Sequence, residues 1–244
     1  MAHRHPDQPV VFFVAGFETT IAPIAGLIEA GLPDNLFLQM AARRTRPVVA
    51  MLLEKHDAAS FDALIAPGHV ASIMGADEWR FVVEKHGLPA AVAGFTPESI
   101  LAAIHSVLRQ QLDSAPELAN CYPQVVSAEG NRRAQQLLEK HFTIADAPWR
   151  GIGSLPDSGF ELASRHEAHN ADKVLSLEER DYPRAGQMPP GCACAEVVLG
   201  QIRPHECPLY GKGCQPRNPV GPCMVSDEGA CRIWWSAGIG RAAA

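Results

Sequence analysis

The sequence predicts an α/β fold: a Rossmann-like domain with a mainly parallel sheet, followed by a small irregular module that is rich in cysteine. Short apolar runs alternate with amphipathic stretches of helical periodicity, as they do in successive β–α–β units. Six of the seven cysteines lie in the last quarter of the chain. We therefore place the α/β domain, with a connector, at residues 1–185 and the cysteine-rich module at residues 186–244.

The composition is ordinary for a globular protein and excludes two classes of function. Of the 244 residues, 47% are hydrophobic and 20% are charged. A formal net charge of −6 argues against nucleic-acid binding, which needs a surplus of Lys and Arg on one face. No apolar run approaches the ~18–20 residues of a membrane helix, and the first residues lack the pattern of a signal peptide. We expect a cytoplasmic protein, in which thiols stay reduced.

Four short apolar runs are candidate strands because they are rich in β-branched, aromatic or small apolar residues. They cover residues 10–15, 47–53, 63–66 and 89–93. Three of the four stop at a turn that contains glycine. This pattern is typical of buried strands that are each followed by a helix.

Three stretches have the apolar spacing of amphipathic helices: residues 21–30, 97–112 and 131–141. The second has the clearest start. Thr96 can cap the helix, Pro97 suits its first position, and Glu98 suits the positive end of the helix dipole. Residues 159–190 lack a repeating pattern, so we expect an irregular connector there.

Polar side chains after the strands are candidates for a cleft. The turns Gly16-Phe17 and Gly94-Phe95 end their strands in the same way, so both are expected at the carboxyl edge of a parallel sheet, where open α/β folds place their sites. Glu18 either makes a polar contact in a cleft at this edge or caps its own helix. His69 either assists proton transfer near a thiol or hydrogen-bonds to a loop backbone.

The cysteine-rich module places its thiols in loops that contain many Gly and Pro residues. Its six cysteines are Cys192, Cys194, Cys207, Cys214, Cys223 and Cys231. Such loops can wrap sulfur ligands around an inorganic centre and turn backbone N–H groups toward it. An iron–sulfur cluster needs four thiolates, which leaves two cysteines that can act as a dithiol beside the cluster.

Two alternatives to the cluster stay open. Structural zinc also takes four sulfur ligands, although the paired C-x-x-C knuckles of zinc ribbons are missing from this segment. Reduced cysteines also fill small apolar sites without binding a metal. The spacing does not fix which four cysteines are ligands.

A series of motifs resembles, in order, those of the hydrogenase maturation family HypD. The two most specific are Trp149-Arg150-Gly151-Ile152-Gly153 and Gly221-Pro222-Cys223-Met224-Val225-Ser226. Gly16-Phe17-Glu18-Thr19-Thr20 and Pro67-Gly68-His69-Val70 match as well, and the resemblance extends over nearly the whole chain. The resemblance implies a role in assembling the Fe(CN)2CO centre of nickel–iron hydrogenases, as a scaffold or redox accessory protein rather than a typical enzyme.

The resemblance also implies cofactors and partners. In the HypD family the C-terminal cysteines hold a 4Fe-4S cluster, a small HypC-like partner helps to carry the iron, and a HypE-like partner delivers cyanide. Family members carry the iron-binding cysteine in Cys-Gly-Gly-His and Gly-Pro-Gly-Cys-Pro-Val-Cys motifs, and this sequence contains neither. We therefore expect a truncated or split form that does not bind the Fe(CN)2CO unit alone and pairs with a separate N-terminal half. A stand-alone iron–sulfur redox protein and a non-functional remnant are the alternatives.

Overall fold

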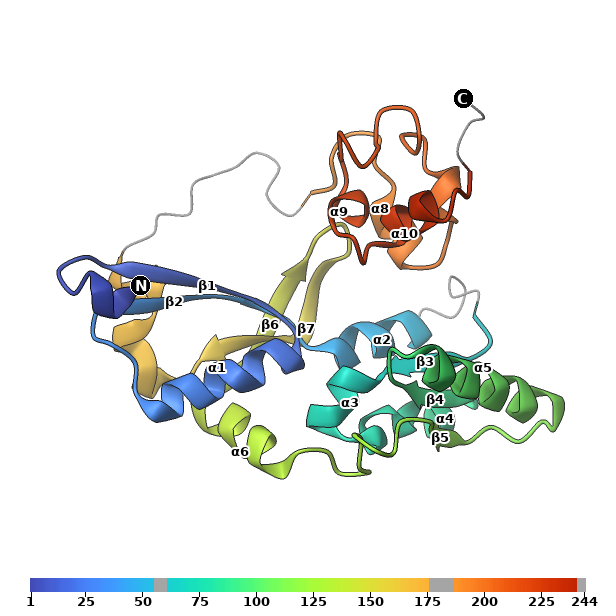
Figure 1. Cartoon of the computed structure of the whole chain (residues 1–244), viewed down its shortest axis with the longest axis horizontal. Helices are drawn as coiled ribbons and strands as arrows, with labels where there is room; N and C mark the ends of the chain where they lie inside the picture. Colours follow the sequence, from blue (N-terminus) through green and yellow to red (C-terminus); the bar gives the residue numbers. More distant parts are fainter. Residues whose placement is uncertain (55–60, 176–186, 241–244) are drawn as a thin grey trace. The chain divides into compact units, whose positions relative to one another are not determined.

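The computed structural model describes residues 1–54, 61–175 and 187–240, and these residues form an α/β structure with parallel sheets and a cysteine-rich C-terminal region (Figure 1). The chain divides into two compact units. Unit 1 comprises Met1–Ala50, Asp62–Ala147 and Pro156–Glu179, and unit 2 comprises Met51–Phe61, Pro148–Leu155 and Arg180–Ala244. The boundary expected between residues 185 and 186 lies at the edge of a segment outside the described residues, so it stays a prediction.

The first sheet of unit 1 is a parallel pair. After a short 3-10 turn (η1, Ala2–Arg4), β1 (Val10–Gly16) pairs with β2 (Leu36–Ala42). Helix α1 (Glu18–Ala30) connects the two strands and packs against one face of the pair. Because β-strand side chains alternate between faces, Val14 and Leu38 point to the same side and meet Ile21 of α1 in a buried core.

The second sheet of unit 1 has three parallel strands in the order β3 (Leu64–Pro67), β4 (Ala90–Ala93) and β5 (Leu118–Asn120). Helices α3 (Gly68–Met74), η2 (Ala76–Trp79) and α4 (Arg80–His86) follow β3, and α5 (Pro97–Leu112) follows β4. All four residues of β4 are buried, and α5 packs Ala103 and Val107 against them. Thr96 caps α5 as predicted: its hydroxyl oxygen accepts the Ser99 N–H at 3.3 Å.

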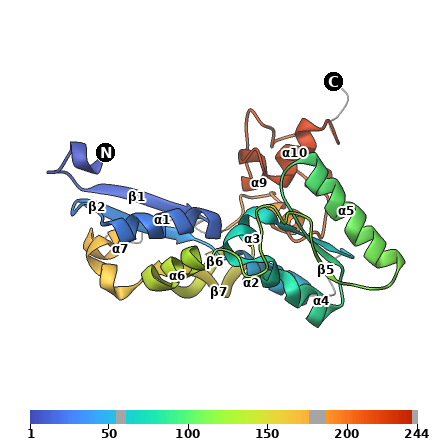
Figure 2. The same cartoon turned by 60° about the horizontal axis from the view of Figure 1, so that its bottom comes forward.

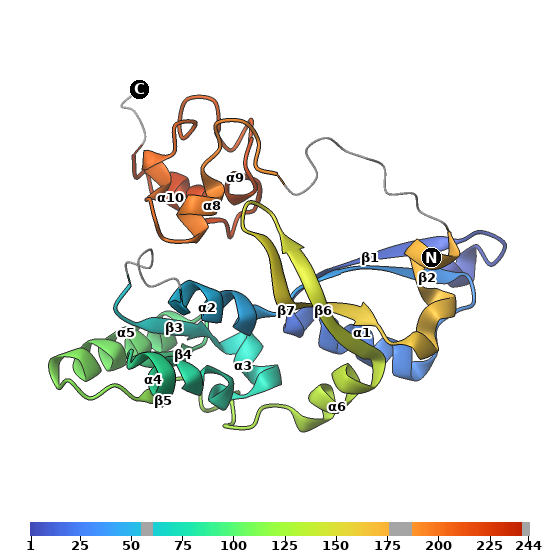
Figure 3. The ribbon, with the colours of Figure 1, turned by 180° about the vertical axis from the view of Figure 1, so that it is seen from behind.

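A long hairpin completes unit 1 and extends into unit 2. Helix α6 (Arg132–His141) packs beside α1 and leads into β6 (Phe142–Trp149), which pairs with β7 (Gly153–Leu162) (Figures 2 and 3). The side chain of Asn131 caps α6 by accepting the Ala134 N–H at 3.0 Å. After the hairpin come η3 (Ser164–His169) and α7 (Ala171–Val174).

The cysteine-rich module consists of short helices joined by loops. The helices are α8 (Cys194–Val198), η4 (Pro204–Glu206), α9 (Pro222–Val225) and α10 (Ala230–Ser236). The core of the module combines buried cysteines with Tyr210 and Met224. The side-chain hydroxyl of Tyr210 donates to the carbonyl oxygen of Ile239 at 2.8 Å, which fixes the end of the described chain to this core.

Most of the predicted elements are confirmed, but two predictions are wrong. Residues 47–53 lie in a helix, α2 (Thr45–Glu54), rather than in a strand. The β-branched pair Val48-Val49 favours a strand, whereas the start of this helix is stabilised by a distant carboxylate, that of Glu18. The predicted irregular connector is also ordered in part: β7 continues to Leu162 before η3 and α7, and residues 176–186 lie outside the described residues.

Candidate functional site

The six cysteines of the module gather in one core. Cys194, Cys207, Cys214, Cys223 and Cys231 are buried, Cys192 is half-buried, and none of the described cysteines forms a disulfide. Short helices and glycine-rich turns position them: Cys194 begins α8, Cys223 lies in α9 and Cys231 lies in α10. The core can therefore present several thiolates to one centre.

Three of these thiols are in direct contact. Cys194 and Cys231 hydrogen-bond to the sulfur of Cys223 and lower the pKa of Cys223 to about 4, with Cys194 as the largest cause. The hydrogen bond with Cys223 is the largest cause that raises the pKa of Cys194. Hydrogen bonds with Cys194 and Cys223 raise the pKa of Cys231, and Cys194 has the larger effect. The Cys223 sulfur also lies 3.9 Å from the carbonyl oxygen of Cys194. Cys223 is therefore the thiol in this group that most readily becomes a thiolate.

The remaining cysteines have different surroundings. The Cys207 sulfur accepts the Ala193 N–H at 3.5 Å, and the Cys214 sulfur accepts the Val220 N–H at 3.3 Å. Backbone N–H groups aimed at sulfur stabilise thiolates and are common around iron–sulfur ligands. Burial raises the pKa of the Cys192 thiol to about 12, so without a bound cation Cys192 is a neutral thiol.

Glycines let the loops of the module pass directly against the thiols. A Cβ atom on Gly221 would lie 2.3 Å from the Cys192 sulfur and 2.6 Å from the Cys194 sulfur. A Cβ atom on Gly229 would lie 2.2 Å from the carbonyl oxygen of Cys223. Only glycine fits these two positions without a shift of neighbouring atoms, which explains the glycines two residues before Cys223 and two residues before Cys231.

The tip of the β6–β7 hairpin packs against the start of α8. Gly151 has a positive φ of 77°, and a Cβ atom there would lie 2.7 Å from the Ala195 Cβ atom and 2.8 Å from the Met188 side chain. The Ile152 N–H donates to the Trp149 carbonyl oxygen at 3.0 Å and closes the turn. The motif Trp149-Arg150-Gly151-Ile152-Gly153 therefore supports the helix that begins with Cys194.

The thiols fit an iron–sulfur cluster in number, chemistry and burial. Among residues 1–54, 61–175 and 187–240, no group of three His, Cys, Asp or Glu side chains is arranged to hold a single metal ion. A four-iron cluster makes a different demand, because its four thiolates spread around an inorganic core instead of converging on one ion. Five buried cysteines and a sixth beside them supply more than the four thiols that such a cluster needs, and two of the sulfurs accept N–H groups.

Glu18 lies at the carboxyl edge of the β1–β2 pair and is 2% exposed. Its carboxylate accepts two hydrogen bonds from Thr45, from the backbone N–H at 2.8 Å and from the hydroxyl at 2.7 Å. Because Thr45 is the first residue of α2, Glu18 caps the neighbouring helix rather than its own. A role for Glu18 in a cleft stays a prediction.

Replacing Glu18 by alanine should lower the free energy of unfolding of unit 1 by about 2–4 kcal/mol, because a buried N–H and a hydroxyl then lose a charged acceptor. Glu18→Gln keeps one acceptor oxygen and should lose less. Urea unfolding followed by circular dichroism measures both. Equal stability of the wild type and the alanine variant would contradict the capping role.

His69 lies at the carboxyl edge of the second sheet. Its ring is 4.4 Å from that of Phe95, centroid to centroid, and both side chains are exposed. His69 follows β3, Phe95 follows β4 and Cys121 follows β5, so three chemically distinct side chains line one sheet edge.

The two Gly-Phe turns do end parallel strands, but β1 and β4 belong to separate sheets, so the turns do not share one edge.

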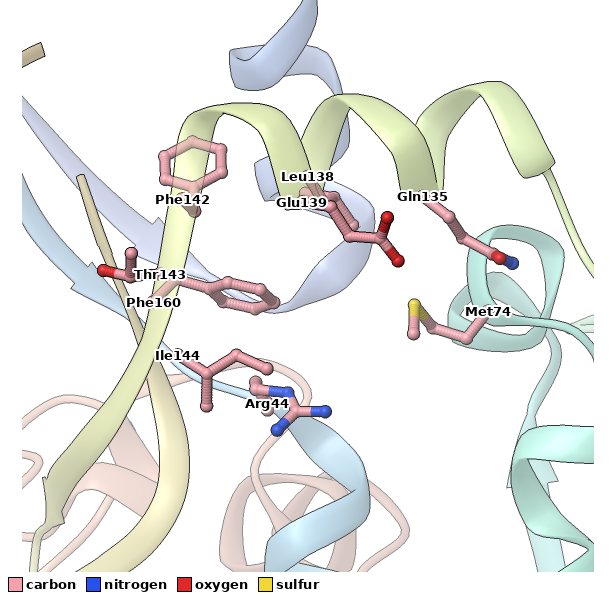
Figure 4. A pocket seen from close by; sticks show the side chains of 9 residues that line it. All are labelled: Arg44, Met74, Gln135, Leu138, Glu139, Phe142, Thr143, Ile144 and Phe160. Atoms are coloured by element: carbon pink, nitrogen blue, oxygen red, sulfur yellow. The ribbon is translucent and has the colours of Figure 1, made fainter. Parts of the chain in front are cut away.

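A pocket of about 400 Å³ in unit 1 contains none of the predicted site residues (Figure 4). Its lining is mainly apolar, with four polar side chains, and consists of Arg44, Met74, Gln135, Leu138, Glu139, Phe142, Thr143, Ile144 and Phe160. The Arg44 guanidinium donates to the Asp157 carbonyl oxygen at 2.8 Å, and the Gln135 amide donates to two backbone carbonyls. These residues come from four separate elements and from the segment before α2, so sequence patterns could not group them.

Within the described ranges, none of the helices has the length and apolar character needed to cross a membrane.

Comparison with known proteins places the chain in a family. Residues 1–238 match the family model HypD, whose description is the hydrogenase formation hypA family. A relative from Methanocaldococcus jannaschii is 39% identical over 240 residues, which are 96% of this chain and 65% of that protein. The hydrogenase maturation factors HypD of Rhodobacter capsulatus and Escherichia coli K12 are each 34% identical, over 100% and 96% of this chain and 65% and 63% of their own lengths.

This chain thus spans slightly less than two thirds of the length of these relatives. The match runs through the motifs around Glu18, Gly151 and the module cysteines, because it covers nearly every residue of the chain. The chain belongs to the HypD family of hydrogenase maturation proteins.

Proposed function

We propose that this protein takes part in assembling the Fe(CN)2CO centre of nickel–iron hydrogenases in the cytoplasm, and that its cysteine-rich module holds a 4Fe-4S cluster that supplies electrons. Membership of the HypD family supports the role in hydrogenase maturation. The single observation that carries the cofactor is the gathering of six thiols, five of them buried, in the core of one small module. A single buried cysteine can act as a small apolar side chain, whereas six thiols gathered in one small core, three of them in direct contact, favour a shared metal or redox role.

The geometry favours a division of the six cysteines into ligands and a dithiol. Cys194 and Cys223 are in contact: their thiols share a hydrogen bond, and the Cys223 sulfur lies 3.9 Å from the Cys194 carbonyl oxygen. We assign the dithiol to this pair and the cluster to Cys192, Cys207, Cys214 and Cys231. Cys207 and Cys214 support the assignment because their sulfurs already accept backbone N–H groups.

The proposed cluster and the proposed dithiol have complementary chemistry. A 4Fe-4S cluster, when bound, supplies one electron at a time. The dithiol of Cys194 and Cys223 loses two protons and two electrons when its sulfur–sulfur bond forms, and regains them when the bond breaks. The low pKa of Cys223 favours the thiolate that starts such an exchange.

The iron centre itself belongs to a larger assembly in this proposal. The Fe(CN)2CO unit is cargo, and it would be held together with HypC-like and HypE-like proteins and with a separate N-terminal half. This chain spans 65% of the length of the Methanocaldococcus jannaschii and Rhodobacter capsulatus relatives.

Single Cys→Ser variants, prepared without oxygen, test the division of roles. Cys194→Ser and Cys223→Ser should keep full iron and sulfide content but lose the two-electron thiol oxidation. Cys231→Ser should lose most of the iron, and Cys121→Ser, outside the module, should change neither. Iron loss in Cys194→Ser that equals the loss in Cys231→Ser would reject the assignment.

Capture of HypC-like and HypE-like proteins under anaerobic conditions tests the maturation role. Retention of either partner by the wild-type chain is the expected result. A stand-alone redox protein is the alternative function, favoured by the compactness of the module within unit 2. It predicts reversible reduction and oxidation of the cluster with neither partner retained.

A further inference from the structure

We propose that three side chains of unit 1, those of Glu29, His141 and His166, form a proton-operated latch. This histidine latch fixes η3, the segment that follows the β6–β7 hairpin, to the ends of α1 and α6. It holds while the two imidazoles carry at most one proton beyond their neutral forms, and it opens when a second proton binds. The inference does not rest on the proposed cluster, because none of these residues lies in the cysteine-rich module.

His141 lies between the other two side chains of the latch. Its Nε2 atom is 2.8 Å from Glu29 Oε2, and its Nδ1 atom is 2.8 Å from His166 Nε2. The His141 side chain is 3% exposed, so both of its ring nitrogens depend on these partners rather than on bulk water. Because the three residues belong to α1, α6 and η3, the row of hydrogen bonds joins three separate elements.

Two protonation states keep this row of hydrogen bonds intact. A carboxylate only accepts hydrogen bonds, so the Nε2 atom of His141 must carry a proton. In a neutral His141 the Nδ1 atom then accepts the Nε2–H of His166. In a protonated His141 the Nδ1–H donates to an unprotonated Nε2 atom of His166. If both rings are imidazolium ions, both facing nitrogens are donors, and the bond between the rings is lost.

The surroundings of Glu29 favour the first extra proton on the imidazole pair. Hydrogen bonds from Lys140 and then from His141 lower the pKa of the Glu29 carboxyl, so this group stays ionised. Lys140 lies 2.7 Å and Arg133 lies 3.8 Å from the Glu29 carboxylate. His141 is also the last residue of α6, where the helix dipole favours a positive charge.

The surroundings of His166 oppose the second extra proton. Burial is the largest cause that lowers the pKa of His166. Four positively charged or titratable neighbours lower it further, and they are His141, Arg165, His169 and Lys140. Glu167 of the same turn is paired with Lys173 at 2.5 Å, so its charge is already balanced. The second proton therefore enters a site that already faces several cations.

The latch should weaken as the pH falls below about 6.5. In the unfolded chain a histidine takes up its proton near this pH. His166 resists the proton in the folded state, so below this pH the unfolded chain binds more protons than the folded chain. The stabilising contribution of His166 is therefore fully present above about pH 6.5 and is lost on acidification.

Opening of the latch should loosen η3 and leave its neighbours in place. The Nδ1 atom of His169 lies 2.8 Å from the Leu36 carbonyl oxygen, and a protonated His169 still donates there. Asn170 forms a bridge with Leu38 of β2 through backbone groups that do not titrate. The effect of acid is therefore confined to the row that contains His141 and His166.

Nitrogen-15 NMR of the imidazoles in the full chain tests the two protonation steps. Between about pH 8 and about pH 5, we expect His141 and His166 to titrate in two steps that are at least about one pH unit apart. His166→Gln should leave a single step for His141. Titration of both rings together near pH 6.5 would overturn the proposal.

Urea unfolding at about pH 7.5 and about pH 5.5 tests the effect on stability. In the wild type, acidification should raise the unfolding equilibrium constant about five- to tenfold more than in His166→Gln, because a glutamine amide can accept or donate a hydrogen bond but does not titrate. His105→Gln, which replaces an exposed histidine of α5, is the matched control and should keep the wild-type pH dependence.

Amide hydrogen exchange locates the opening. The His166 and Asn170 amides donate to the carbonyl oxygens of Ala163 and Glu167. After correction for the intrinsic rate, both should lose protection at about pH 5.5 in the wild type, whereas the Val107 amide in α5 should not. The same pH dependence of stability in the wild type and His166→Gln, or unchanged protection of η3 in acid, would reject the latch.

Discussion

Replacing Gly221 by alanine should strip the cysteine-rich module of most of its iron and destabilise it by about 1–3 kcal/mol, the usual cost of overpacking a core. The added methyl group would lie 2.3 Å from the Cys192 sulfur and 2.6 Å from the Cys194 sulfur, so both thiols must move. The backbone of Gly221 is extended, with φ of −97°, and tolerates alanine. The collision with the thiols alone would therefore cause the loss.

Gly213→Ala is the matched control for Gly221→Ala, because it adds the same methyl group within the same module. The nearest atom, on the Leu209 side chain, would be 3.7 Å away, an ordinary contact distance. Iron and acid-labile sulfide per chain, with urea unfolding followed by tryptophan fluorescence, measure both variants. Equal iron content in the two variants would mean that the position of the Cys192 and Cys194 sulfurs does not matter for the cluster.

Gly151→Ala should weaken the contact between the hairpin tip and α8 and lower the free energy of unfolding by about 2–4 kcal/mol. A positive φ of 77° costs alanine about 1 kcal/mol or more, and overpacking against Ala195 and Met188 adds about 1–3 kcal/mol. Because α8 packs in the same core as the proposed ligands Cys207, Cys214 and Cys231, iron binding should weaken in parallel with stability.

Two further substitutions separate the causes of the Gly151 effect. Gly153 also has a positive φ, of 108°, but no atom lies within 4 Å of its added methyl group, so Gly153→Ala reports the backbone cost alone. Ala195→Gly combined with Gly151→Ala removes the methyl group that collides and should restore part of the lost stability. No recovery in the double variant would show that the contact with Ala195 is not the cause.

Local patterns in the sequence predicted much of unit 1. Thr96 and Pro97 predicted the start of α5, and the glycine turns predicted the ends of β1 and β4, because both signals depend only on neighbouring residues. The prediction of a strand at residues 47–53 failed because the helix there starts with a capping bond from Glu18, 27 residues before Thr45. The β6–β7 hairpin was missed because Pro148 and Pro156 interrupt the alternation that marks strands.

The candidate site was predictable in composition but not in arrangement. Clustering of six cysteines in loops predicted a thiol-rich core, and the structure brings them together as expected. Contacts between Cys194 and Cys223, and between Gly221 and both Cys192 and Cys194, join separate loops and follow no sequence spacing.

The central claim is that the module thiols hold one iron–sulfur cluster, and anaerobic reconstitution with iron and sulfide tests it most directly. The account predicts about four iron ions and about four sulfide ions per chain, with a cluster absorption that Cys231→Ser loses and Cys121→Ser keeps. A module that stays folded and colourless, without inorganic sulfide or with zinc as its only metal, would contradict the account.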